Sequence, residues 1–307
     1  MRHLSATSKN CARLAMAATA VAAAVVPAVV SAGGTASAST SAPAAKAVSF
    51  ADPSTTSLIQ RLGTVPACKR PTVVLVDGAW ADTSSWSGEV RVLAAAGYKV
   101  RAIGNPVEDL TTDAETVHDF LTTISGPIVL VGHSYGGAVI TNAATGIPNV
   151  KALVYVDASA PAPGETNGSL SGSTSILNKD TASQLFTEVP YPNAPAGDTD
   201  LYLNEDIFVH YFASDLPVAE AEELWASQRG ASTAAFNTPS RTAAWKTVPS
   251  WYFISSNDQI ITASSELAMA KRAHSHITVF PGGSHLTLIS HPNAVTGTIA
   301  SAIRSVT

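Results

Sequence analysis

The residues best suited to covalent chemistry lie in one glycine-rich stretch, Gly132-His133-Ser134-Tyr135-Gly136-Gly137. An apolar run before it, Ile128–Val131, predicts a buried strand, and the residues from Ser134 to near Gly146 have the apolar spacing of a helix. A serine at so tight a strand-to-helix turn is typical of a nucleophile elbow, which exposes the hydroxyl beside backbone N–H groups. The pattern could arise by chance in a chain rich in Ala, Gly and Ser, but the flanking elements favour the elbow. We therefore predict that Ser134 is a nucleophile.

A serine nucleophile needs a base, and the base needs a group that orients it. Among the eight histidines, His285 follows a predicted strand and the flexible turn 281–284. A loop of this kind can bring the imidazole ring back over the edge of the sheet. We predict that His285 is the base, with His291 as second choice.

Two aspartates compete for the role of the acid. Asp258 lies in a short polar loop after the predicted strand Trp251–Ser255, whereas Asp157 ends the preceding strand and leads into a long insertion. The chain order of serine, acid and histidine fits this class of elbow with either aspartate. The order therefore leaves both open, and we prefer Asp258 because of its loop.

The elements that must position these residues alternate along the chain between apolar strands and amphipathic helices. The predicted strands are Thr72–Val76, Lys99–Ile103, Ile128–Val131, Lys151–Val156, Ser250–Ser255 and His276–Phe280. The predicted helices are Trp86–Ala96, Thr112–Ile124, 134–146, Ser264–His274 and Ala294–Ile303. This alternation predicts a doubly wound, mostly parallel α/β sheet. Such sheets bind ligands beyond the carboxyl ends of their strands, where Ser134 is expected.

One connection is much longer than the others. More than ninety residues separate Val156 from Ser250, far beyond an ordinary strand-to-helix connection. We expect a helical cap at about residues 161–247, inserted after the strand Lys151–Val156 and covering the active face.

Residues 1–38 have the pattern of a secretory signal peptide. Three basic residues precede the apolar run Leu14–Val30, and Ala36-Ser37-Ala38 offers a cleavage site. The apolar run is short for a membrane span and is interrupted by Pro27. We therefore expect cleavage rather than a stable membrane anchor, and a secreted, extracellular protein.

After the leader, residues 39–70 are rich in Ser, Ala and Pro and predict a linker that leads into a domain at 71–307. Cys68 would be the one cysteine after cleavage, and we expect it to be buried and inert. The net charge of −5 and the absence of a basic cluster exclude a nucleic-acid partner. No histidine or carboxylate spacing matches a metal site, so we expect neither a metal nor a cofactor.

Four segments together resemble the α/β-hydrolase superfamily, nearest its small bacterial esterase-like members. The segment 73–80 resembles the loop after the family's third strand, 132–137 its elbow, 257–258 its acid loop and 283–285 its histidine loop. The resemblance runs from about Pro71 to the end of the chain. One position departs from it, because Asp77 stands where the family usually has histidine.

The resemblance implies a secreted serine hydrolase, a carboxylesterase that cleaves small-molecule esters through an acyl-enzyme on Ser134. It also implies that the backbone N–H groups of Ala79 and Tyr135 form the oxyanion hole. The candidate substrate contacts are Trp80, Phe212 and Trp225. Two alternatives remain: a cofactor-free lyase or haloperoxidase-like enzyme of the same fold, and a binding protein without catalysis, which the Asp77 departure favours.

A carboxylate aimed at an oxyanion hole would repel the negative charge that develops there. In an active enzyme we therefore expect the Asp77 carboxylate to turn away from the hole, to pair with a cation, or to accept backbone N–H groups.

Overall fold

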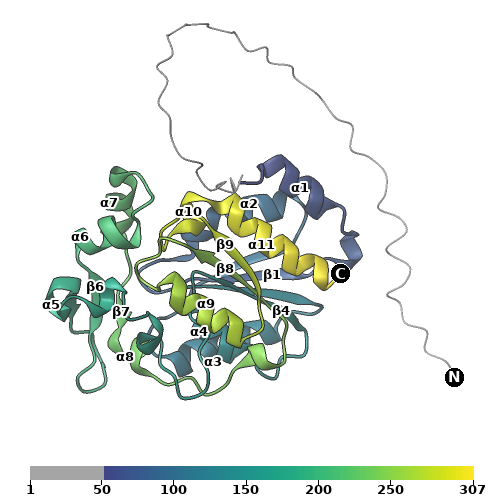
Figure 1. Cartoon of the computed structure of the whole chain (residues 1–307). Coiled ribbons are helices and arrows are strands. Elements are labelled where there is room, and N and C mark those ends of the chain that lie inside the picture. The colour runs from purple at the N-terminus through teal and green to yellow at the C-terminus, as the bar shows by residue number, and fades with distance from the viewer. Residues whose placement is uncertain (1–51) are drawn as a thin grey trace, which may run out of the picture. The chain divides into compact units, whose positions relative to one another are not determined.

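Six parallel strands form the centre of the protein, in the order β2-β1-β3-β4-β8-β9 (Figure 1). The computed structural model describes residues 52–307, so the predicted leader and its cleavage site lie outside the described residues. The strands are β1 (Thr72–Val76), β2 (Val100–Ile103), β3 (Ile128–His133), β4 (Val150–Val156), β8 (Ser250–Ser255) and β9 (His276–Phe280). The doubly wound parallel α/β sheet predicted from the sequence is confirmed.

Helices cover both faces of the sheet, which is why its inner strands are continuous apolar runs. Figure 1 shows α1 (Thr55–Gly63), α2 (Ser87–Ala95), α10 (Thr287–Ser290) and α11 (Pro292–Ser305) on one face. It shows α3 (Leu110–Thr122), α4 (Tyr135–Ala143) and α9 (Ala263–Arg272) on the other. Asp109 caps α3 by accepting the backbone N–H groups of Thr111 and Thr112, so this helix begins two residues before the predicted one.

The segment before β1 is helical and packs on the domain. Leu58 and Leu62 of α1 are buried, and α1 lies against α2 and α11. A 3-10 turn, Ala67–Lys69, follows. Cys68 lies on this turn and is exposed, so the prediction that it is buried is wrong.

The cap follows β4 and contains a small antiparallel sheet in the order β5-β6-β7, which the expectation of a helical cap missed. Its strands are β5 (Phe186–Val189), β6 (Asp200–Leu203) and β7 (Ala231–Ser232). Its helices are α5 (Ala182–Leu185), α6 (Glu205–Ile207), the π-helical turn Phe208–Phe212, α7 (Val218–Ala226) and α8 (Thr233–Asn237). Short 3-10 turns lie at Thr83–Trp86, Gly168–Leu170, Ile176–Asn178 and Ala244–Lys246. Strands of two to four residues carry too short an alternation to be recognised in the sequence.

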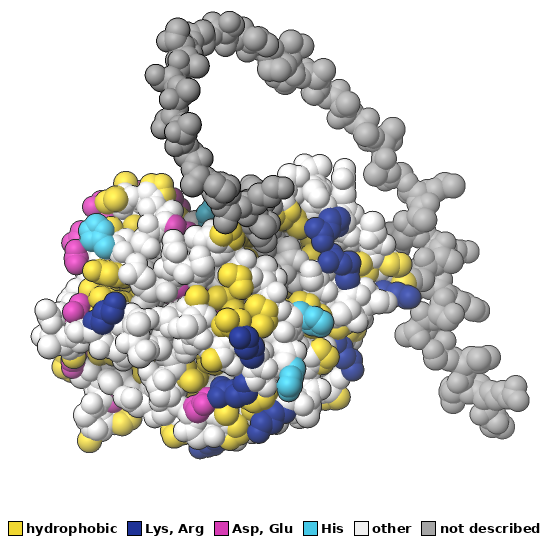
Figure 2. Space-filling model, in the orientation of Figure 1, with side chains coloured by type: hydrophobic (Ala, Val, Ile, Leu, Met, Phe, Trp, Pro, Cys, Tyr) yellow, Lys and Arg dark blue, Asp and Glu magenta, His cyan; other side chains and the backbone are white. Residues whose placement is uncertain are grey.

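The outer surface of the cap is acidic. Figure 2 shows Asp and Glu side chains over the region of α6 and α7, while most Lys and Arg side chains on this face lie over the sheet domain. The exposed acidic residues of α6 and α7 are Glu205, Asp206, Glu220, Glu222 and Glu223. This charge disfavours the approach of an anionic substrate across the cap. Within residues 52–307, no helix has the length and apolarity needed to cross a membrane.

Candidate active site

Ser134 occupies the single position between β3 and α4. Its backbone is left-handed, with φ 54° and ψ −125°, a conformation that costs energy for a residue other than glycine. A Cβ atom at Gly132 would lie 2.5 Å from the carbonyl oxygen of Gly136, and one at Gly136 would lie 2.6 Å from that of Asp77. Glycine at 132 therefore lets α4 turn tightly from β3, and glycine at 136 lets α4 approach the end of β1.

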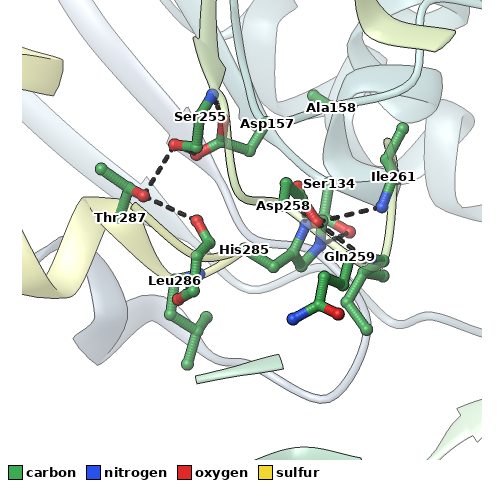
Figure 3. A network of polar contacts seen from close by, with 12 residues as sticks. Ser134, Asp157, Ala158, Ser255, Asp258, Gln259, Ile261, His285, Leu286 and Thr287 are labelled. Carbon is green, nitrogen blue, oxygen red and sulfur yellow. Dashed lines mark hydrogen bonds and ion pairs between the residues drawn. The ribbon is translucent and has the colours of Figure 1, made fainter. Parts of the chain in front are cut away.

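The structure brings Ser134, His285 and Asp258 together from three different loops (Figure 3). The Nε2 atom of His285 lies 2.7 Å from Ser134 Oγ, and its Nδ1 atom lies 2.6 Å from Asp258 Oδ2. Asp258 Oδ1 accepts the backbone N–H groups of Ile260 and Ile261 at 2.7 and 3.1 Å. Since an ionised carboxylate only accepts hydrogen bonds, Nδ1 carries the hydrogen and Nε2 is left to accept the serine proton.

The two rival residues lie elsewhere. Asp157 ends β4 with φ 44°, and its carboxyl group contacts the backbone N–H and the hydroxyl of Ser255 at 2.7 and 2.9 Å. His291 is partly exposed, with Nδ1 3.1 Å from Asp52. Between the two candidate acids, the structure therefore places Asp258 and not Asp157 on His285.

The loop after β1 lies directly against the serine. A Cβ atom at Gly78 would come within 3.1 Å of Ser134 Oγ, and the next residue, Ala79, is fully buried. Tyr135 is the first residue of α4, where backbone N–H groups have no partner inside the helix. Its hydroxyl donates to Asp113 Oδ2 on α3 at 2.6 Å, which fixes the start of α4. The two predicted oxyanion donors thus belong to the segments that flank Ser134.

A sequence model described as the alpha/beta hydrolase family matches residues 73–297, which is most of the chain. The chain belongs to this family. The elbow, the loop after β1 and the histidine loop all fall inside the matched segment, so the family resemblance noted in the sequence is confirmed.

The chain is similar to two known proteins over part of their length. The carbendazim hydrolyzing esterase of Nocardioides sp. (strain SG-4G) is 35% identical over 107 residues, which cover 30% of this chain and 44% of that protein. The pheophorbidase of Raphanus sativus is 28% identical over 166 residues, which cover 48% of this chain and 60% of that protein. The matches thus span less than two thirds of either relative.

Among solved structures, polyneuridine aldehyde esterase has the same fold. It matches with a TM-score of 0.64 at 17% identity, over 76% of this chain and 98% of that chain.

Asp77, the departure from the family pattern, is fully buried. Its Oδ2 atom lies 3.5 Å from the Nη1 atom of Arg229, a cap residue, and neither carboxyl oxygen has a hydrogen-bond partner among residues 52–307. Burial raises the pKa of Asp77 to about 7, against the opposing effects of nearby backbone N–H groups and of the Arg229 charge. Of the three expected arrangements, the structure shows the cation pair. Asn105 braces the loop instead, because its Nδ2 donates to the Asp77 carbonyl at 3.2 Å.

A second cap residue, Asp215, contacts the histidine loop. Its carboxylate accepts a short hydrogen bond from the Ser284 hydroxyl and another from Ser290 Oγ at 2.6 Å. The His133 ring, inside the elbow, donates from Nε2 to the His285 carbonyl at 2.8 Å. Sequence reasoning missed these contacts because their partners lie from 69 to 152 residues apart in the chain.

Aromatic side chains cover the triad. The Phe212 ring lies 5.0 Å from the His285 ring and 5.9 Å from the Trp80 ring. Trp80 also stacks on Phe186 and Phe236 and donates its indole N–H to the Leu201 carbonyl of the cap. The indole of Trp225 donates instead to the Leu203 carbonyl, within the cap.

Of the three predicted substrate contacts, Trp80 and Phe212 therefore lie beside the triad and Trp225 does not. The adjoining cavity, lined partly by Trp80 and Phe212, has a volume of about 20 Å³. This is close to the room needed by one water molecule, and none of the three triad residues lines this cavity.

Three buried carboxyl groups gather behind the histidine. The nearest carboxyl oxygens of Asp157, Asp258 and Glu266 lie within 4.8 Å of one another. Burial raises the pKa of Asp157 and of Glu266 well above the ordinary values, and the neighbouring carboxylates add to both effects. At such distances the three groups cannot all be ionised without a balancing proton or cation.

Proposed function

We propose that this hydrolase cleaves carboxylic esters of small molecules through an acyl-enzyme on Ser134. The observation that carries the proposal is the row of hydrogen bonds from Ser134 Oγ through His285 to Asp258, at 2.7 and 2.6 Å, at the elbow. The two partial relatives, named as an esterase and as pheophorbidase, support an ester as the substrate class.

In this mechanism Ser134 Oγ attacks the ester carbonyl while His285 Nε2 takes its proton. The backbone N–H groups of Ala79 and Tyr135 stabilise the oxyanion, and Asp258 stabilises the imidazolium. His285 then gives the proton to the leaving alcohol, and a water activated by the same imidazole releases the acid. The hydrogen bonds from the backbone N–H groups of Ile260 and Ile261 hold the Asp258 carboxylate in its orientation toward His285.

Replacement of the nucleophile tests the proposal. Ser134→Ala should lower kcat by about 10⁴-fold or more on p-nitrophenyl acetate and abolish labelling by an active-site-directed phosphonate. Ser250→Ala is a matched control, because Ser250 is a buried serine at the amino end of β8 whose hydroxyl contacts Ser275. A Ser134→Ala enzyme that keeps more than a tenth of wild-type turnover would overturn the mechanism.

A substrate panel separates the alternatives of the same fold. Esters, amides and cyanohydrins are compared at equal concentration, and we expect turnover of esters. Cleavage of cyanohydrins without ester hydrolysis would favour the lyase, and no phosphonate labelling would favour the binding protein.

We also propose that the protein is exported without a stable membrane anchor, on the basis of the sequence pattern of residues 1–38. Amino-terminal sequencing of the protein recovered from culture medium should find Ser39 first. A chain that begins at Met1 and stays with the cells would refute cleavage.

A further inference from the structure

A row of short polar contacts joins Asp157 to the histidine loop (Figure 3). Asp157 Oδ2 lies 2.9 Å from Ser255 Oγ, which lies 2.7 Å from Thr287 Oγ1. Thr287 Oγ1 in turn lies 2.6 Å from the carbonyl oxygen of Ser284. All four residues are buried. The row therefore runs from the end of β4, past the end of β8, to the peptide bond that begins His285.

The number of hydrogens available in this row determines which group donates in each hydrogen bond. Three hydrogen bonds need three hydrogens, but the Ser255 and Thr287 hydroxyls supply one each, and the Ser284 carbonyl can only accept. The third hydrogen has to come from Asp157. Its Oδ1 atom already accepts the backbone N–H of Ser255 at 2.7 Å, which leaves Oδ2 to carry the proton.

We propose that Asp157 is a positioning residue: a neutral carboxylic acid that donates to Ser255 and, through Thr287, fixes the Ser284–His285 peptide. The role rests on the proposed function, since it matters for turnover only if His285 is the base. Asp157 itself touches neither His285 nor, in this proposal, the substrate.

The charged surroundings agree with a neutral Asp157. The titratable groups that act on it are Asp258 in the acid loop, Glu266 on α9, Asp215 in the cap and Tyr252 on β8. Burial raises the pKa of Asp157 and the Asp258 charge raises it further, while the hydrogen bond from the Ser255 backbone N–H opposes both. Glu266 has no hydrogen-bond partner for either carboxyl oxygen within the described residues, so it gives Asp157 no compensating donor.

The conservative variant distinguishes a neutral acid from a needed charge. In Asp157→Asn, the amide oxygen can accept the Ser255 N–H and the amide nitrogen can donate to Ser255 Oγ, so the row stays complete. We expect kcat and KM within about threefold of wild type from pH 6 to 8. Asp157→Leu has a similar volume but no donor, and it should lower kcat roughly tenfold to a hundredfold with KM unchanged, through a misplaced imidazole.

A break further along the row tests the same idea without touching a carboxyl group. Thr287→Val removes one hydroxyl and should lower kcat to the same extent as Asp157→Leu. Thr296→Val is the matched control, because Thr296 is equally buried on α11 and donates to a backbone carbonyl, that of Pro292, at 2.7 Å. It should leave kcat within about twofold of wild type, since its partner is not in the histidine loop.

Infrared difference spectroscopy reads the proton without turnover and also serves if Asp157→Leu fails to fold. The difference spectrum of wild type minus Asp157→Asn at pH 7 should show the C=O stretching band of a protonated carboxyl group.

A missing band would overturn the proposal even if Ser134 labelling succeeds. An Asp157→Asn variant as impaired as Asp157→Leu would overturn it as well. Activity that is lost on dialysis against EDTA and restored by a divalent cation would also overturn it, because a cation would then balance the cluster. If the esterase proposal failed instead, the carboxyl C=O band would still be present. The two failures are therefore distinguishable.

Discussion

Two fully buried carboxyl groups stand near Ser134 in very different surroundings. Asp258, in the acid loop, accepts three hydrogen bonds from Ile260, Ile261 and His285. Asp77, in the loop after β1, has the Arg229 guanidinium at 3.5 Å and no hydrogen-bond donor to its carboxyl group among residues 52–307. The two groups are thus equally buried but differ in their hydrogen-bond donors, and a buried carboxyl group without donors is the harder one to ionise.

The difference matches what each side of the site requires. Beside His285 a negative charge stabilises the imidazolium, whereas beside an oxyanion it is harmful. At roughly 7 Å and an effective dielectric near 20, a charged Asp77 would repel the oxyanion by about 2 kcal/mol. One oxyanion-hole donor contributes about 3 kcal/mol. The loop after β1 can thus tolerate Asp77 best when the carboxyl group is neutral or when Arg229 balances its charge.

The largest effect is expected when the carboxylate of Asp258 is replaced by an amide. Asp258→Asn should lower kcat by about 10⁴-fold, because the amide favours the wrong tautomer of His285. Asp157→Asn, the same change one strand away, should cost far less. Steady-state kinetics on p-nitrophenyl acetate measure both, and the reverse ranking would assign the acid to Asp157.

The next test adds a methyl group to the loop after β1, on the oxyanion side of the site. In Gly78→Ala, the new Cβ atom would lie 2.6 Å from Ser134 Cβ and 2.9 Å from the His133 carbonyl oxygen. Displacement of the loop by such a contact should lower kcat/KM by about a hundredfold. Gly63→Ala is the control, since its Cβ would meet no atom within 4 Å. Equal activity of the two variants would show that the loop after β1 adapts freely.

The pH profile tests the charge of Asp77 directly. Because burial raises its pKa to about 7, Asp77 becomes charged as the pH rises through that value. The wild-type kcat/KM should then fall, by about 30-fold if the repulsion reaches 2 kcal/mol. Asp77→Asn should stay within about tenfold of wild type at pH 7 and should not fall above it.

Arg229→Gln sharpens the same experiment. Without the cation, Asp77 ionises less readily, so the decline in kcat/KM should move to higher pH. A decline that stays in place in both variants would belong to another group.

The smallest expected effects lie in the cap. Phe212→Ala should change the ratio of kcat/KM between p-nitrophenyl butyrate and acetate several-fold, because this ring contacts His285. Trp225→Ala should change the ratio less and lower Tm instead, because its indole N–H holds β6 through Leu203. The opposite ranking would place Trp225 against the acyl chain.

Sequence reasoning succeeded where the signal is local. The apolar runs of β1 and β3 and the glycines around Ser134 each determine their conformation within a few residues. The choice of the acid needed the structure, because Asp157 and Asp258 both follow strands. Only the folded loop shows which of the two faces His285. Arg229 and Asp215 were missed because each depends on a partner far along the chain, and the cap sheet was missed because its strands are only two to four residues long. Asp77 could be recognised as unusual from the sequence, but its cation could not be named.

The contact between Asp215 and the histidine loop also bears on how such enzymes diversify. A cap inserted between two strands looks like a module that recombination could exchange to change substrate range. Here, however, Asp215 receives hydrogen bonds from Ser284 and Ser290, on either side of His285. A foreign cap without an equivalent carboxylate would leave both hydroxyls without their acceptor and loosen the loop. Exchange of specificity by grafting therefore has to transfer this aspartate together with the aromatic lining.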